Sequence, residues 1–273
     1  MRHNIQPNLI KTWTRLKRCA LFDVVKFLIV ILALVLLTLR GSQRLGYNWQ
    51  WYLVPRYIFT IENARFVPGP LLQGIMITFR IAGLSLLCSC LFGLVAALFN
   101  LSNSLIARTV ARLYVELIRN TPLLVQLFFI YFVLAPIFGV GRLAAGVLAL
   151  SLFEGAYAAE IFRAGIVSIH KGQWEAAYSL GLNSFDMYFR VILPQAVRRV
   201  LPPLTSQAIS LIKDSALVST IAIYDLTMQG QAIIAETFLT FEIWFTIAAM
   251  YLLVTVALSL VVSVMENRLR LEA

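Results

Sequence analysis

Four charged residues within long apolar stretches are the first candidates for a chemical role: Arg80, Glu154, Lys213 and Asp214. A charge inside a membrane-spanning helix is costly and marks a functional site by default. A guanidinium and a carboxylate at one depth would pair with each other, or with the carboxylate and ammonium groups of an amino acid. These four residues are therefore candidates for a substrate path. A purely structural ion pair between Arg80 and Glu154 is the alternative.

Arg80 and Glu154 are predicted to lie at similar depths. Arg80 lies about 9 residues, or ~14 Å, from the outer end of its predicted helix, and Glu154 lies about 11 residues, or ~17 Å, from that of its own. Both helices are predicted to run inward, so both charges are expected to face one central cavity. Lys213 and Asp214 are adjacent and point about 100° apart on a helix, so they cannot both face one partner.

The sequence contains none of the common catalytic or metal-binding motifs. It has no GxxxxGK[ST] loop, no HExxH and no GxSxG, and its histidines are His3 and His170. The cysteines Cys19, Cys88 and Cys90 form no CxxC pair, so no disulfide framework or zinc site is implied. We therefore expect this chain to catalyse no reaction and to bind no cofactor or metal. Energy or direction for its function has to come from something else.

The elements that position these charges are predicted to be helices in a bilayer. Of the 273 residues, 60% are hydrophobic and 13% are charged, whereas soluble domains carry about 25% charged residues. The expected fold class is therefore all-α integral membrane. A spanning helix needs about 20 apolar residues. Six segments qualify, the fifth being the weakest because of Pro202 and Pro203: they are 22–39, 71–99, 108–136, 143–162, 200–224 and 241–265.

Basic residues set the predicted orientation. Arg15, Lys17 and Arg18 precede the first helix, so the N-terminus is expected in the cytoplasm, and six crossings return the C-terminus there. The net charge of +10 fits this cytoplasmic excess. The basic residues form no tract beside stacking aromatics, so nucleic-acid binding is set aside. Segment 225–240 is a predicted outer loop. The other outer loop, 40–70, carries four arginines, although Lys and Arg normally concentrate in cytoplasmic loops. It is expected to lie along the outer interface as an aromatic belt.

One face of helix 71–99 carries small residues at four-residue spacing, which allows close helix contact in lipid. These residues are Ser85, Ser89, Gly93 and Ala97. We expect ordinary packing within the bundle, and a dimer seam is the alternative.

The predicted cytoplasmic segment 163–199 contains the most informative stretch. Residues 173–180 favour a short helix, and Gly181 suits the left-handed conformation that ends it. Ser184 can cap a second helix, with Asp186 in its first turn. Pro194 disfavours helix at the residue before it. The exposed aromatics predicted here are typical of a docking element: Trp174, Tyr178, Phe185 and Tyr188.

Within this segment, Glu175-Ala176-Ala177 followed by Gly181 and Leu193-Pro194 resembles the EAA signature of ABC-importer permeases. Val191 stands where isoleucine is usual. Three further blocks resemble the polar amino-acid branch, the histidine/glutamine-type permeases, so that the resemblance covers about residues 70–270. The blocks are 119–126, 159–165 and 209–214. The last of them implies a shared role for Lys213 and Asp214 in the conduction path or in helix packing.

The resemblance implies a five-helix type I importer core in residues 70–273, with an extra helix and the outer interfacial loop in residues 1–69. It also implies a coupling helix, within segment 163–199, that docks on an ATPase. The implied ATPase-coupling residues are Glu175, Ala176, Ala177, Gly181, Ser184 and Asp186.

The expected function is that of a non-catalytic permease subunit of an ATP-driven ABC importer for polar amino acids, in the bacterial inner membrane with both termini cytoplasmic. The expected partners are ATPase subunits that bind ATP and Mg, a second permease of the same or a different chain, a periplasmic or tethered amino-acid-binding protein, and lipid. One alternative is an ion-coupled secondary amino-acid transporter with Glu154 and Asp214 as proton carriers. A membrane scaffold is another.

Overall fold

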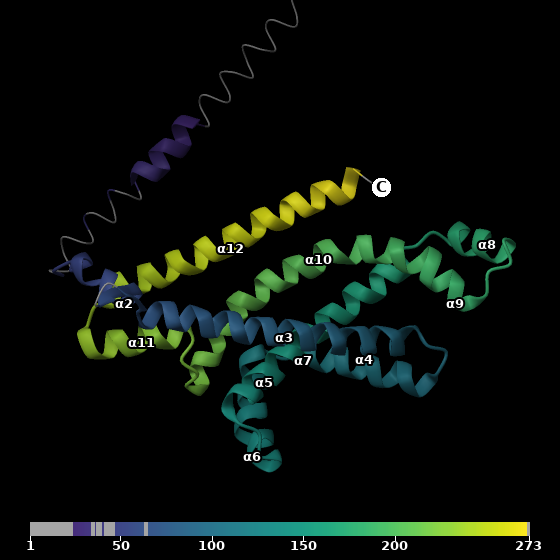
Figure 1. Ribbon diagram of the computed structural model, residues 1–273, viewed down its shortest axis with the longest axis horizontal. Coiled ribbons are helices and arrows are strands. Elements are labelled where there is room, and N and C mark those ends of the chain that lie inside the picture. Colours follow the sequence, from purple (N-terminus) through teal and green to yellow (C-terminus); the bar gives the residue numbers. More distant parts are fainter. Residues whose placement is uncertain (1–23, 34–35, 37–39, 41–46, 63–64, 272–273) are drawn as a thin grey trace, which may run out of the picture. The chain divides into compact units, whose positions relative to one another are not determined.

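The computed structural model describes residues 24–33, 36, 40, 47–62 and 65–271. The chain divides into two units, Met1–Trp49 and Gln50–Ala273. In the first unit, Val24–Ala33 forms an apolar helix of exposed residues. The predicted cytoplasmic N-terminus and most of the rest of span 22–39 lie outside the described residues. The second unit holds the helical bundle (Figure 1) and includes residues 50–69.

Helices α3 (Pro70–Leu101) and α7 (Arg142–Val167) form the centre of the bundle, and each is long and apolar enough to cross a membrane. The small-residue face of α3, with Ser89, Gly93 and Ala97, is buried. A Cβ built on Gly93 would lie 2.6 Å from the Cβ of Ala158 in α7. Because this face packs on α7 of the same chain, the prediction of packing within the bundle is confirmed.

Gly93→Ala is expected to destabilise the bundle, because the added methyl would also meet the Ala159 nitrogen and the Gly155 oxygen at 3.0 Å. Overpacking of this kind costs about 1–3 kcal/mol. Gly83 in the same helix has open space around its missing Cβ, so Gly83→Ala is expected to gain about 0.5–1 kcal/mol of helix stability. Thermal unfolding of both purified variants in one detergent tests this contrast, and equal melting temperatures would contradict it.

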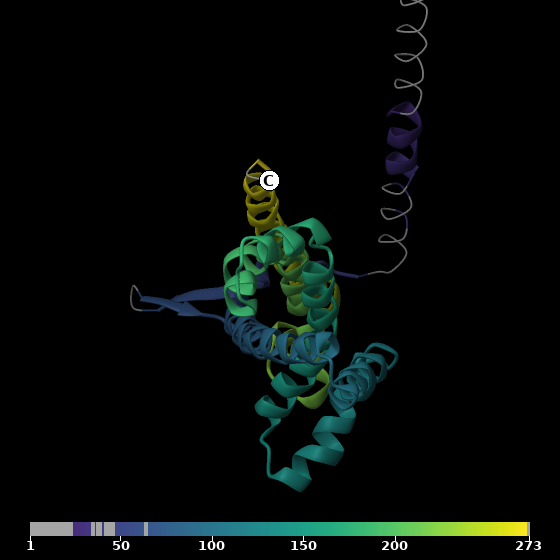
Figure 2. The ribbon, with the colours of Figure 1, turned by 90° about the vertical axis from the view of Figure 1, so that its right-hand side faces the viewer.

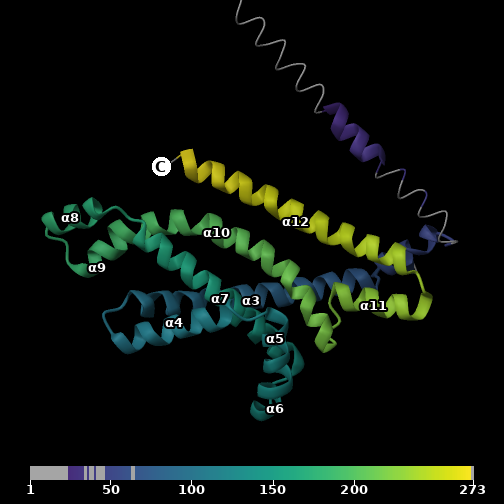
Figure 3. The same ribbon diagram turned by 180° about the vertical axis from the view of Figure 1, so that it is seen from behind.

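The predicted span 108–136 is wrong as a single helix. Helix α4 (Leu105–Arg119) and the helical segment Leu123–Phe138 meet at 107°. Views from the front and from behind both show the second part turned away from the bundle (Figures 1 and 3). This part consists of α5 (Leu123–Phe128), a π-helical stretch (Phe129–Leu134) and α6 (Ala135–Phe138).

A buried glutamine fastens this bend. The Nε2 of Gln126 donates to the Ile118 carbonyl oxygen at 2.7 Å, and to the carbonyl and hydroxyl oxygens of Thr121 at 3.1 and 2.7 Å. Pro122 cannot continue α4, since it has no N–H to donate. Block 119–126 of the sequence is therefore a structural corner.

The fifth predicted span, 200–224, corresponds to α10 (Leu193–Asp214) followed by a 3-10 stretch (Ser215–Ile221). Helix α10 runs through both prolines, and helix α12 (Thr240–Leu271) packs beside it. Judged by length and composition, three described helices can span a membrane: α3, α7 and Thr240–Met265 of α12. The bent pair counts as a fourth if it is one broken span.

The predicted outer loop 225–240 is mostly a helix, α11 (Leu226–Thr237). Buried Asp225 caps it, with Oδ1 accepting from the Met228 nitrogen at 2.9 Å. The Leu226 nitrogen donates to the Thr78 hydroxyl of α3 at 3.2 Å. The bond to Thr78, and apolar residues that the loop prediction overlooked, fasten α11 across one end of the bundle.

Residues 50–69 are folded where the structure describes them. They form a 3-10 turn (Trp51–Leu53), α2 (Pro55–Ile58) and an antiparallel hairpin of β1 (Phe59–Glu62) and β2 (Arg65–Pro68). The Gln50 nitrogen donates to Oε1 of buried Glu242 in α12 at 2.6 Å. Tyr57 packs against the apolar cluster that includes Leu71 of α3. The start of this segment is thus held on the bundle.

Candidate functional site

Two short helices, α8 (Lys171–Ser179) and α9 (Ser184–Met187), lie at the end of the bundle opposite α11 (Figure 1). Gly181 between them has a φ of +71°. Glycine adopts this left-handed conformation without the cost that a Cβ imposes. The predicted pair of helices joined by a tight glycine turn is therefore present.

The cap of α9 lies one residue earlier than predicted. Asn183 is the N-cap: its Oδ1 accepts from the Asp186 nitrogen at 2.8 Å, and its Nδ2 donates to Oδ2 of Asp186 at 2.9 Å. Ser184 is the first helical residue and is exposed. Asparagine and serine cap helices about equally well, so residue type alone did not distinguish the two positions. Asp186 lies in the first turn as predicted and pairs with Nε of Arg190 at 2.8 Å.

The break predicted before Pro194 is also wrong. A π-helical stretch (Tyr188–Ile192) leads directly into α10, and Leu193 has helical angles of −58° and −45°. Proline normally disfavours this conformation in the preceding residue. The wider turn of the π-helical stretch leaves room for the ring of Pro194, and the nitrogen of Pro194 needs no N–H there. Helices α9 and α10 are consequently joined by continuous helical backbone.

The α8–α9 segment has one buried and one exposed side. Ala177 is 2% exposed and packs with Met187 and Ile192, so its methyl group supports the segment from inside. Glu175, Ala176 and Gly181 are exposed. The exposed side also carries large apolar side chains, which are Tyr178, Leu180, Phe185, Tyr188 and Phe189.

Trp174 departs from the prediction of an exposed aromatic. Its side chain is half-buried against the cluster around Ala177, and its ring meets Tyr188 edge-on at 5.3 Å. Trp174 therefore stiffens the segment, while the exposed side provides a surface suited to another protein.

Glu154 is buried between α7 and α10, with 1% of its surface exposed. Its Oε2 accepts from Nε2 of Gln207, and its Oε1 has no hydrogen-bond partner among the described residues. Asp214 approaches closely enough to interact with the same carboxylate. Gln207 and Asp214 are seven residues apart and share one face of α10. A buried carboxylate with an unused oxygen is suited to a cationic group.

Arg80 does not join this cluster, so the ion pair predicted with Glu154 is not present. Its side chain is exposed, because it lies off the α3 face that packs on α7. Lys213 is exposed as well, whereas its neighbour Asp214 is half-buried. The two neighbours therefore have different surroundings, which is consistent with the angle of about 100° between adjacent positions of a helix.

Sequence reasoning missed Gln207. The available signal was an amide in the middle of a predicted membrane span, since such a group has to find a partner when it is buried. Two residues of block 159–165 make contacts within the bundle. Glu160 pairs with Arg163 at 2.9 Å, and a Cβ on Gly165 would collide with Val200 of α10.

An apolar cavity of about 330 Å³ lies between α3, α10 and α12. Its walls are apolar except for Thr205, and they include Phe79, Leu86 and Ile209. A polar amino acid would lose hydrogen bonds to water there without replacement. The Glu154 cluster is therefore a better candidate for a polar substrate than this cavity.

Comparison with known proteins gives consistent matches. Residues 89–271 match the family described as "Binding-protein-dependent transport system inner membrane component". The glutamine transport system permease protein GlnP of Escherichia coli is 41% identical over 204 residues, which cover 74% of this chain and 93% of GlnP. The L-cystine transport system permease protein TcyB of Bacillus subtilis is 43% identical over 204 residues, which cover 73% of this chain and 87% of TcyB.

The fold has a similar counterpart among solved structures. A chain in the "Crystal structure of an amino acid ABC transporter with histidines" has a TM-score of 0.69 and 40% sequence identity, covering 73% of this chain and 94% of its own length. The family match contains α8, α9 and the Glu154 cluster.

Proposed function

The chain belongs to the family of binding-protein-dependent transport system inner membrane components, and on this basis we propose that it is the permease subunit of an ATP-driven importer of polar amino acids. The names of the relatives, glutamine and cystine permeases, support this substrate class. The observation that carries the proposal is the protruding α8–α9 segment, whose exposed residues suit docking on another protein.

The α8–α9 segment is the element proposed to dock on the ATPase. Glu175 offers a charge to the partner, Ala176 permits close approach, and the exposed aromatics anchor the interface. Ala177 and Asp186, with the cap residue Asn183, hold the segment in shape, and exposed Ser184 belongs to the docking surface. Because helical backbone is continuous from α9 into α10, a displacement of the docked segment moves the helix that carries Gln207 and Asp214.

The substrate path is proposed to pass the Glu154 cluster. The free oxygen of Glu154 would accept from the ammonium group of an amino acid, and Asp214 would add a second negative charge. Arg80 and Lys213 remain candidates for the substrate carboxylate, since both are exposed on this chain and thus accessible to a path shared with a second permease.

The proposed assembly contains two permease subunits, of one or two kinds, two ATPase subunits and a periplasmic or tethered binding protein. ATP and Mg would be bound by the ATPase, and this chain would perform no covalent chemistry. The family description supports an inner-membrane location. Both termini are proposed to face the cytoplasm, on the same side as α8 and α9.

Affinity purification of the tagged full chain from mildly solubilised membranes tests this function. We expect an ATPase subunit to copurify, and the complex in vesicles to import glutamine or cystine when ATP and the binding protein are supplied. Recovery of the folded chain without an ATPase in several mild detergents, with uptake driven by an ion gradient, would instead establish the secondary transporter.

A further inference from the structure

The hairpin β1–β2 has one face that is apolar throughout. The register pairs Phe59 with Pro68 and Ile61 with Phe66, and cross-strand partners lie on the same face. Phe59, Ile61 and Phe66 are 42%, 72% and 62% exposed, and the rings of Phe59 and Phe66 stack at 5.6 Å. This face is therefore largely uncovered within the chain.

The opposite face is more polar. It contains Thr60 paired with Val67, and Glu62 paired with the exposed Arg65 beside the turn. The hairpin is thus amphipathic, with its cation on the side away from the aromatic rings.

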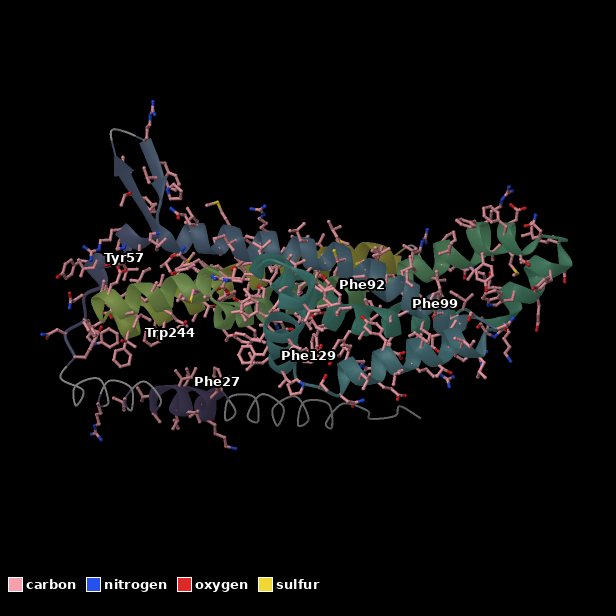
Figure 4. All side chains as sticks on the ribbon, turned by 90° about the horizontal axis from the view of Figure 1, so that it is seen from below. Phe27, Tyr57, Phe92, Phe99, Phe129 and Trp244 are labelled. Atoms are coloured by element: carbon pink, nitrogen blue, oxygen red, sulfur yellow. The ribbon has the colours of Figure 1, made fainter. Side chains whose placement is uncertain are left out.

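The base of the hairpin is held in a defined direction. The Gly69 nitrogen donates to the Ile58 oxygen at 2.8 Å, and Nε2 of Gln73 donates to the Pro68 oxygen at 2.8 Å. A Cβ on Gly69 would lie 2.5 Å from the Tyr57 oxygen, so glycine is needed for this close approach. The hairpin leaves the end of α3 sideways, as Figures 2 and 4 show from two directions.

A hairpin of two strands is marginally stable in water and needs a surface against which to bury its apolar face. Deep in hydrocarbon, the unpaired N–H and C=O groups along its edges would lack partners. The boundary between headgroups and acyl chains meets both requirements, because it offers apolar contact on one side and water on the other.

The position of the hairpin agrees with that boundary. It ends at Pro68, and α3, which is long and apolar enough to cross a membrane, begins at Pro70, so the hairpin lies at the level where α3 would enter the bilayer. The exposed aromatics Trp51 and Tyr52 precede it in the same unit, and tryptophan and tyrosine concentrate at this depth. Exposed Arg56 adds positive charge that suits lipid phosphates, and Arg65 with its cross-strand partner Glu62 makes the polar face suited to the headgroups.

We propose that β1–β2 is a membrane-interface anchor that lies flat on the bilayer, with Phe59, Ile61 and Phe66 among the acyl chains and Arg65 at the headgroups. The anchor fixes the height at which α3 begins in the membrane. This assignment depends on α3 crossing the bilayer and is independent of the transported substrate.

Spin labels on the two faces of the hairpin test the proposal. The full chain, with Cys19, Cys88 and Cys90 replaced by serine, carries a nitroxide at Ile61→Cys or, as the matched control, at Thr60→Cys. The purified protein is placed in vesicles of phosphatidylethanolamine and phosphatidylglycerol. Collisions of the nitroxide with oxygen, which concentrates among the acyl chains, report exposure of the label to lipid. Collisions with a water-soluble nickel chelate report its exposure to water.

We expect the oxygen-to-nickel ratio at position 61 to exceed that at position 60 several-fold, and the same contrast for a label at Phe66→Cys. A label at position 61 that is as accessible to nickel as the control would overturn the proposal. Shielding of position 61 from both reagents would overturn it too, since a protein surface would then cover this face. Transport by the assembled importer can persist in either case, so the two proposals fail separately.

Discussion

Gly181→Val is expected to reduce recovery of the ATPase with the tagged chain by about tenfold or more, since a left-handed residue with a Cβ costs about 1–2 kcal/mol and branching adds to this. The missing Cβ of Gly181 faces open space, so the obstacle is the φ of +71°. A turn that relaxes to negative φ changes the angle between α8 and α9. Copurification followed by uptake in vesicles measures the effect.

Gly181→Asn is the matched control, because asparagine enters the left-handed region more readily than other residues with a side chain. It adds polar bulk at the same exposed place, and it is expected to keep recovery of the ATPase near that of the original chain. Equal losses for both variants would mean that the partner surface excludes any side chain at this position. Equal retention would show that the left-handed turn is not needed for coupling.

Glu154→Ala is expected to lower the rate of uptake at limiting substrate by about 10- to 100-fold, the range that corresponds to loss of a hydrogen bond to a charged group at 1.5–3 kcal/mol. The variant removes the acceptor for Gln207 as well as the charge. Glu154→Gln keeps an acceptor of the same shape and removes the charge alone. If the charge binds the substrate ammonium, both variants should raise the substrate concentration needed for half-maximal uptake.

Glu160→Gln is the control on the same helix. It breaks the partly exposed pair with Arg163, which contributes about 0–1 kcal/mol, so uptake should change little. Normal uptake by Glu154→Gln beside failure of Glu154→Ala would make the carboxylate a structural partner of Gln207. Unchanged substrate affinity in a folded Glu154→Ala variant would exclude the binding role altogether.

Local chemistry decided which parts of the fold were predictable. Gly181 could be placed from residue type, since few other residues tolerate its conformation. The bend after α4 could not, because it depends on Gln126 reaching back to Ile118 and Thr121, a contact that hydropathy does not register. The helix in 225–240 was missed because its burial against α3 and α12 is a tertiary effect.

The candidate site divides in the same way. Glu154 was found from its cost in an apolar helix, but Arg80 was placed beside it, as an ion-pair partner or as a second group for an amino acid, from depth alone. The depth of a residue along a helix can be counted from the sequence. The direction of its side chain depends on which face of the helix packs against its neighbours. Because α3 packs on α7 through Ser85, Ser89 and Gly93, Arg80 is turned elsewhere and Gln207 of α10 meets the carboxylate.

The bend at Pro122 bears on how the chain is inserted during synthesis. The part beyond the bend, Leu123–Phe138, is about 24 Å long, short of the ~30 Å hydrocarbon thickness. Helix α4 before it carries Arg108, Arg112 and Arg119, which oppose partitioning into lipid. The Tyr114 hydroxyl of α4 donates to the Leu152 oxygen of α7 at 2.7 Å, and α5 also contacts α7. We therefore expect residues 105–138 to settle in the bilayer only after α7 has been synthesised, so that insertion here is a cooperative step between segments made at different times.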